Sequence, residues 1–170
     1  MSSYLINNYC GLTLFSASNN IVSKNVIRYT HESGISIVYG TSNNILNNTL
    51  LDNSGGGISL DFSKNNRVYR NHVENNSFIG IWVGYSFGTK IYENNIINNK
   101  INAWWANTPL EFFLLWRNRW YNNYWGAPCT LPKLIFGMIY LGAIGNFPLG
   151  YPRVQYDLKP AQIPYDISNL

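Results

Sequence analysis

Apolar and polar positions recur along the first hundred residues at an interval of 23. Glycines 11, 34, 57 and 80 each open a similar phrase, such as Gly34-Ile35-Ser36-Ile37. One apolar column contains Val22, Ile45, Val68 and Ile91, and one polar column contains Asn25, Asn48, Asn71 and Asn94. A fixed period of this length indicates a solenoid, because each repeat buries its apolar face only by stacking on its neighbours.

Short alternating runs within each repeat predict strands rather than helices. In residues 34–38, Ile35 and Ile37 point to one side and Ser36 and Val38 to the other. Two further runs follow, around residue 45 and over residues 48–51, and Asn, Ser and Gly separate the runs. The pattern therefore predicts an all-β fold: a right-handed single-stranded parallel β-helix of about five 23-residue coils with a C-terminal cap.

The fifth coil departs from this pattern. Ala103 takes the glycine position, which predicts that Trp104 points inward and that Trp105 points outward beside Trp82. One inserted residue then places Asn118, Trp120 and Asn123 at an interval of 24 from Asn94, Ile96 and Asn99. Residues 110–116 form an apolar run, which we expect to be a bulge or a short helix.

The repeat ends at residue 123, which predicts a division of the chain into β-helix coils (1–123) and a C-terminal cap with an extended tail (124–170). We expect a hairpin over residues 134–149 and an extended segment over 152–167. Such a cap covers the terminal strand edges of a β-helix.

The N-terminus begins in mid-repeat, with Tyr4 and Asn7 lying 23 residues before Ile27 and Thr30. It shows no basic segment followed by an apolar one, so we expect no signal peptide in this chain. The pattern favours a fragment of a larger protein. The alternative is self-association of two copies through the uncapped N-terminal coil.

Composition agrees with a stacked β structure. The chain has 26 asparagines in 170 residues, and only 12% of its residues are charged. Stacked asparagine side chains can form hydrogen-bonded ladders. The net charge is +4, but Lys and Arg are scattered in the sequence, so we expect no nucleic-acid partner. No apolar run approaches the roughly 18 residues needed to span a bilayer, so we expect no membrane insertion.

The repeat motif, Gly-Ile-Ser-Ile followed by Asn-Asn-Ile-Leu and Asn-Asn, resembles the NosD-like, carbohydrate-binding and sugar-hydrolase group of parallel β-helix proteins. Residues 123–126, 157–161 and 164–167 are similar to the closing segment of such proteins in archaeal and bacterial cell-surface polypeptides. The resemblance implies an extracellular or cell-surface location. It implies little about function, because these coils serve lyases, hydrolases, epimerases, adhesins and accessory proteins.

An aromatic surface is the first candidate site. Trp82 and Trp105, predicted to be adjacent and outward, would form a platform for sugar rings, with Asp61 as a hydrogen-bonding partner. The alternative is that residues 110–116 fold back and cover both tryptophans. Tyr39, Phe62 and Tyr85 form a neighbouring column, in which Tyr39 and Tyr85 are candidates for substrate contact and a structural stack is the alternative.

A charged surface is the second candidate site. Arg70, His72 and Glu74 alternate outward, and Glu93 is expected beside Arg70 in the next coil. A general acid or base next to a cation would suit a uronate lyase. The alternative is an exposed ion pair with a solvated histidine.

The acidic residues argue against hydrolysis. Glycosidases usually need two carboxyl groups about 5–9.5 Å apart. None of the eight acids shares a column with another, so catalysis by Asp61 or Glu74 is the weaker hypothesis. Two separated histidines and two separated cysteines predict no metal site, and we expect no cofactor.

The sequence therefore favours a polysaccharide-contacting β-helix module of a larger extracellular or cell-surface protein. A glycoside hydrolase or polysaccharide lyase acting on the outer β-helix face is one alternative. A structural surface spacer is the other.

Overall fold

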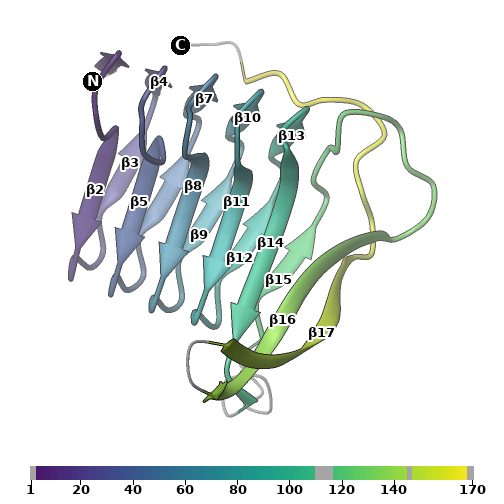
Figure 1. The fold of residues 1–170 in the computed structure, drawn as a ribbon. Helices are drawn as coiled ribbons and strands as arrows, with labels where there is room; N and C mark the ends of the chain where they lie inside the picture. Colours follow the sequence, from purple (N-terminus) through teal and green to yellow (C-terminus); the bar gives the residue numbers. More distant parts are fainter. Residues whose placement is uncertain (1–2, 110–116, 145–146, 168–170) are drawn as a thin grey trace.

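The computed structural model, which describes residues 3–109, 117–144 and 147–167, is a right-handed parallel β-helix of about five coils (Figure 1). Each coil contributes one strand to each of three faces, and equivalent strands pair in parallel along the axis. The predicted all-β solenoid is therefore confirmed.

The faces are named here in chain order within a coil. The first face contains β2 (Leu12–Phe15), β5 (Ile35–Val38), β8 (Gly56–Asp61), β11 (Ile79–Gly84) and β14 (Ile101–Asn107). The second contains β3 (Ile21–Ser23), β6 (Asn44–Leu46), β9 (Arg67–Tyr69), β12 (Lys90–Tyr92) and β15 (Arg119–Tyr121). The third contains β1 (Ser3–Ile6), β4 (Asn25–Arg28), β7 (Thr49–Leu51), β10 (His72–Glu74) and β13 (Asn95–Ile97).

Inward-facing aliphatic side chains fill the space between the three faces. A representative column, Ile27, Leu50, Val73 and Ile96, is wholly buried. The glycine column lies where the chain turns from the third face to the first. A Cβ at Gly34 would lie 2.8 Å from Leu50 Cδ2 and 3.1 Å from the carbonyl oxygen of Gly57. Close approach of neighbouring coils therefore explains this glycine, since its φ is not positive.

Buried asparagines form hydrogen-bonded ladders along the axis. In the ladder Asn25–Asn48–Asn71–Asn94–Asn123, each side-chain amide donates to the carbonyl oxygen of the next side chain at 2.9–3.0 Å. Asn71 Nδ2 also donates to the backbone carbonyl of Ile45, and Asn71 Oδ1 accepts from the backbone N–H of Asn48. The ladder ends on the buried Asp157, whose Oδ2 accepts from Asn123 N at 2.9 Å.

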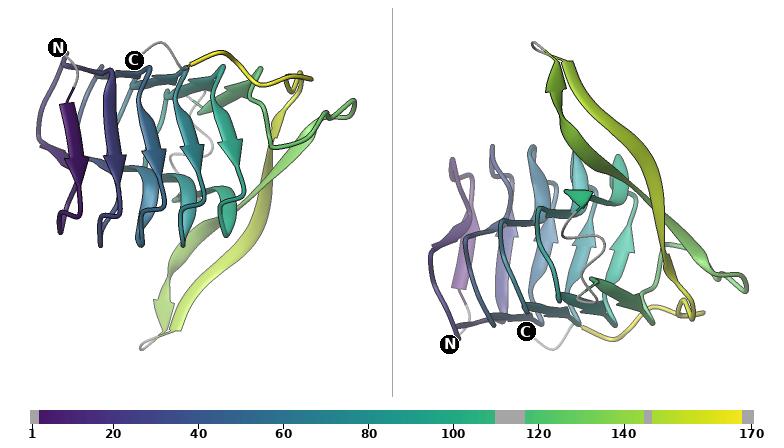
Figure 2. Two further views of the ribbon diagram at one scale, coloured as in Figure 1. Left: turned by 90° about the horizontal axis from the view of Figure 1, so that it is seen from above. Right: turned by 90° about the horizontal axis from the view of Figure 1, so that it is seen from below.

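An antiparallel hairpin covers the C-terminal end of the coils. β16 (Lys133–Ile144) adds to β14 and β17 (Phe147–Asp157) adds to β15, which joins the first and second faces into one sheet. The hairpin crosses the coil end obliquely and extends beyond it (Figure 2). Its second strand runs on to Asp157, where an extended tail was predicted from Pro152. The division of the chain at residue 123 stays a prediction.

The tail then passes along the third face. Tyr165 N donates to Asn95 Oδ1, and Asn95 Nδ2 donates back to the carbonyl of Tyr165, both at 2.8 Å. The tail therefore pairs with a buried asparagine at the start of β13.

The predicted orientation of the two adjacent tryptophans is wrong. Trp104 pairs with Trp82 and faces outward, whereas Trp105 pairs with Val83 and is wholly buried. This coil is one residue short, so Asn102 takes the glycine position. Its side chain accepts hydrogen bonds from Asn99 N and Nδ2 at 3.1 and 3.2 Å and extends a second asparagine ladder. A shift of one residue moves every side chain of a strand to the opposite face.

The spacing after the fifth coil also differs from the predicted 24. Trp120 pairs with Ile91, and the side chain of Asn123 accepts from that of Asn94, an interval of 29 in each case. The insertion lies between residues 107 and 118, and the predicted bulge or helix over 110–116 lies outside the described residues. In the first coil the interval is 22, so Leu5 rather than Tyr4 pairs with Ile27.

The outer side of the second face carries two columns that the sequence analysis missed. One contains the cations Arg67, Lys90 and Arg119, and the other contains Tyr69, Tyr92 and Tyr121. The tyrosine rings stack with centroids 5.0 and 4.9 Å apart and interplanar angles of 2° and 4°. Cations that are scattered in the sequence are therefore aligned in space, next to aromatic residues.

The asparagine ladder predicts that replacing a buried ladder asparagine lowers the free energy of unfolding much more than replacing an outward asparagine of the neighbouring coil. Asn71→Ala removes the partners of Asn48 N and Nδ2 inside the core, so we expect it to lower the free energy of unfolding by about 3 kcal/mol. Asn44→Ala, on an outward position of β6, should cost less than about 0.5 kcal/mol. Urea unfolding followed by circular dichroism measures both. Equal losses would contradict a structural role for the ladder.

The tyrosine column predicts a loss of stability in alkali. Burial raises the pKa of Tyr92 and Tyr121 above the ordinary 10.0, with smaller contributions from neighbouring tyrosines and Glu93. Their stabilising contribution is therefore complete below the unfolded-state pKa of 10.0 and is lost as the pH rises through the folded-state values. Urea midpoints measured between about pH 9 and about pH 11 should fall less steeply in the Tyr92→Phe/Tyr121→Phe variant. Parallel slopes would rule out this coupling.

Candidate functional site

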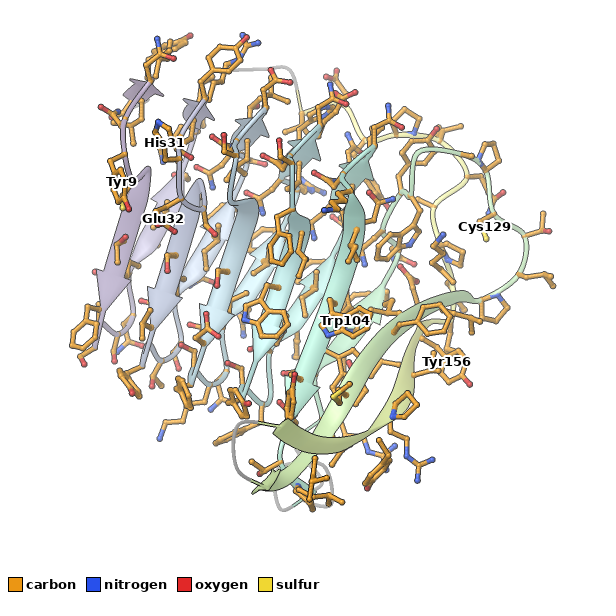
Figure 3. All side chains as sticks on the ribbon, in the orientation of Figure 1. Tyr9, His31, Glu32, Trp104, Cys129 and Tyr156 are labelled. Carbon is orange, nitrogen blue, oxygen red and sulfur yellow. The ribbon has the colours of Figure 1, made fainter. Side chains whose placement is uncertain are left out.

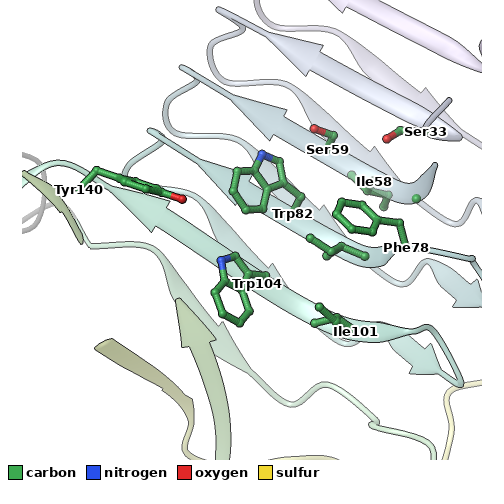
Figure 4. Close-up of a pocket in the computed structure, with 10 residues that line it drawn as sticks. Ser33, Ile58, Ser59, Phe78, Trp82, Ile101, Trp104 and Tyr140 are labelled. Carbon is green, nitrogen blue, oxygen red and sulfur yellow. The ribbon is translucent and has the colours of Figure 1, made fainter. Parts of the chain in front are cut away.

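An apolar pocket of about 370 Å³ lies on the outer side of the first face (Figure 4). Trp82 on β11 and Trp104 on β14 stand side by side because their strands pair in register. Phe78 and Ile101 lie toward one end of the pocket and Tyr140 toward the other. The arrangement resembles a small-ligand site, where apolar walls carry few polar groups.

Asp61 does not line the pocket itself, but its carboxylate is hydrogen-bonded to two residues that do, Trp82 and Ser59. Trp82 Nε1 donates to Asp61 Oδ1 at 2.6 Å, and Ser59 Oγ donates to Asp61 Oδ2 at 2.7 Å. The absence of a side chain at Gly84 leaves room for the Trp82–Asp61 hydrogen bond. A Cβ at Gly84 would lie 2.7 Å from the Trp82 ring and 2.6 Å from Asp61 Oδ1. The carboxylate therefore fixes the indole orientation and retains lone pairs for a further donor.

Trp105, predicted as a substrate-binding residue, does not lie on this surface. Its ring is buried at the C-terminal end of the core, where Nε1 donates to the carbonyl of Ile135 at 3.1 Å. Trp104 takes its place beside Trp82. The outward position predicted for Trp105 is therefore occupied by Trp104, because this coil is one residue shorter than the regular repeat.

Three large side chains of the pocket wall, Phe78, Ile101 and Tyr140, were not predicted from the sequence. Phe78 lies 23 residues after Gly55, so a bulky ring replaces a small residue of the preceding coil, and that substitution could have been recognised. Ile101 lies a further 23 residues on. Tyr140 comes from the hairpin, outside the repeat, so its approach to the pocket had no signal in the periodicity.

A row of aromatic rings runs along the corner beside the first face and ends at this pocket. Successive centroids in the row Phe15, Tyr39, Phe62, Tyr85 and Tyr140 lie 5.7, 5.3, 4.9 and 6.0 Å apart. Tyr39 and Tyr85 therefore belong to a stack, as the structural alternative predicted. Tyr39 is 54% exposed, and substrate contact by Tyr39 and Tyr85 stays a prediction.

The predicted charged site consists of two separate pairs. Arg70 Nε lies 2.9 Å from Glu93 Oε2, and this hydrogen bond raises the pKa of Arg70. His72 Nε2 lies 2.7 Å from Glu74 Oε2. Arg70 lines a cavity of about 420 Å³ under the C-terminal tail, a cavity whose lining includes neither His72 nor Glu74. An exposed ion pair such as Arg70–Glu93 contributes little to stability, and a catalytic role for Arg70, His72 and Glu74 stays a prediction.

The described residues contain no helix that is both long enough and apolar enough to cross a membrane.

The chain resembles a known protein family. The model of the family described as periplasmic copper-binding protein (NosD) matches residues 2–147. No curated protein matches the chain.

Among the described residues, His, Cys, Asp and Glu side chains do not gather into a set of copper ligands. Copper sites use thiolate, thioether and imidazole ligands. His72 is hydrogen-bonded to Glu74, and His31 stacks on Tyr9. Cys129 lies at the opposite end of the coils from His31 (Figure 3). Within the described parts of the chain, no three His, Cys, Asp or Glu side chains come together, so these residues do not fit a copper site.

The matched segment includes all four repeat glycines and the first strand of the hairpin. It agrees with the resemblance inferred from the Gly-Ile-Ser-Ile repeat and with the observed solenoid. The chain therefore belongs to the NosD family of parallel β-helix proteins.

Proposed function

We propose that this chain is a polysaccharide-contacting module of an extracellular or cell-surface protein, with the pocket at Trp82 and Trp104 as its contact site. The observation that carries the proposal is the pair of adjacent, partly exposed indoles beside a hydrogen-bonded carboxylate. The family description as periplasmic supports a location outside the cytoplasm.

The chemistry of the pocket suits a sugar ring. One side of a pyranose presents C–H groups, which pack on the negative face of an aromatic ring. The hydroxyl groups at the rim of the sugar need acceptors, and Asp61 retains free lone pairs beside Trp82. The indole of Trp82 is held in place before binding, which reduces the entropy lost on association.

The position of the pocket suits a polymer rather than a single small molecule. Its walls come from three successive coils, through Ser59, Trp82 and Trp104. Trp82 and Trp104 are both partly exposed on the outer side of the sheet. A linear chain can therefore lie along the solenoid axis and place consecutive sugars on consecutive coils.

The test is binding to neutral polysaccharides such as xylan, glucomannan and hydroxyethyl cellulose. We expect at least one of them to retard the chain in affinity electrophoresis. Trp82→Ala/Trp104→Ala should lower the association constant at least about tenfold, since loss of about 1.4 kcal/mol corresponds to a factor of ten. Asp61→Asn should produce a smaller loss, because the amide keeps one acceptor oxygen.

The matched control is Tyr9→Ala, which removes an aromatic ring that is 70% exposed on a distant coil. It should bind like the wild type. Unchanged binding by the double tryptophan variant would overturn the proposal. New reducing ends or unsaturated uronate released by the wild type and lost in Asp61→Asn would replace it with a degrading enzyme.

A further inference from the structure

The outer side of the second face carries a row of cations with one member on each of three successive coils. β9, β12 and β15 share one pattern: a cation, an inward apolar residue and a tyrosine. Register places Arg67 beside Lys90 and Lys90 beside Arg119. Because parallel strands lie about 4.8 Å apart, the three cations are spaced at about that distance along the axis.

Nothing in the described structure neutralises this row. Each of the three side chains is exposed, and within the described segments none of them forms an ion pair. The acid nearest along the chain is Glu93, which follows Tyr92 and is bound to Arg70. Like charges directly opposite one another in a sheet are destabilising. The row therefore has an energetic cost that a bound polyanion would remove.

The tyrosine column beside the cations limits the kind of polyanion. Its rings stack face to face at 5.0 and 4.9 Å, so both faces of Tyr92 and one face each of Tyr69 and Tyr121 are covered by a neighbouring ring. Nucleic-acid bases bind by stacking on free aromatic faces, which this column offers only on its two end rings. Tyrosine hydroxyls can instead exchange hydrogen bonds with the ring and hydroxyl oxygens of a sugar chain.

The row leads into a cavity at the C-terminal end of the coils. This cavity, of about 590 Å³, is lined by Arg119 and Tyr121 from β15 and by Tyr156 and Lys159 from the hairpin strand and the segment after it. It continues the same combination of positive charge and tyrosine beyond the last coil. A chain lying along the row therefore has a wider site at its end.

We propose that the outer side of the second face binds an acidic polysaccharide, a chain with carboxylate groups at regular intervals, along Arg67, Lys90 and Arg119. A row with one cation per coil matches the charge density of a chain with one carboxylate per sugar better than that of a densely sulfated chain. The guanidinium groups of Arg67 and Arg119 can each hold a carboxylate through two parallel hydrogen bonds. This surface lies on a different face of the β-helix from the tryptophan pocket and does not depend on the function proposed there.

The test is binding of the full chain to polygalacturonate. Binding should weaken between about 50 mM and about 300 mM NaCl, because salt screens exposed charges. Arg67→Gln/Lys90→Gln/Arg119→Gln should bind at least about tenfold more weakly and show a shallower salt dependence. Trp82→Ala/Trp104→Ala should bind polygalacturonate normally, which separates this surface from the tryptophan pocket.

The matched control, Lys24→Gln/Lys64→Gln/Lys100→Gln, removes the same charge from other positions and should keep most of the affinity. Lys90→Gln alone, in the middle of the row, gives a partial loss if the triple variant folds poorly. Equal binding by the row and control variants would overturn the proposal. Tighter binding to heparin or to single-stranded DNA, with the same dependence on the row, would replace the carboxylated chain by that ligand.

Discussion

The in-register stacking of buried asparagines is the constraint on which the rest of this structure depends. A buried amide has two donors and an acceptor to satisfy, and here each finds its partners in the neighbouring coils and in its own. An amide that slipped by one residue would lose these bonds in a water-free interior, at a cost of about 1–3 kcal/mol for each unsatisfied group. The ladders therefore hold every strand of a coil in a single register.

This constraint also explains the irregular coils. The fifth coil drops one residue because Asn102 then reaches Asn99, and the outward position passes from Trp105 to Trp104. After the insertion, Asn123 returns to the ladder of Asn94 and meets Asp157 from the hairpin. Asp157 is thus both the last step of a ladder and the attachment point of the cap.

Repetition also governs the outer surfaces. Any residue type that recurs at the same position in several coils becomes a straight row at the strand spacing. One such row is aromatic and ends at the tryptophan pocket, and another is cationic and ends at the cavity beside β15. The aromatic row follows the corner beside the first face and the cationic row follows the second face, so the chain offers two linear surfaces of different chemistry. The isolated pairs Arg70–Glu93 and His72–Glu74 form no comparable row.

The sequence by itself determined the period, the inward columns, the asparagine ladders and the family, because residues 11 to 94 repeat at a constant interval of 23. The position of Asp61 beside Trp82 followed from the same interval. Only the tertiary structure decided the register of the last coil, where the interval between paired residues changes to 22 and then to 29. This register depends on which buried side chains meet in space. Asn102 bonds to Asn99 and Asn123 bonds to Asn94, and these two contacts set the register. The tertiary structure thereby decided that Trp104 rather than Trp105 faces outward. It also brought Tyr140 to the pocket and aligned Arg119 with Lys90 and Arg67, cations that are scattered in the sequence.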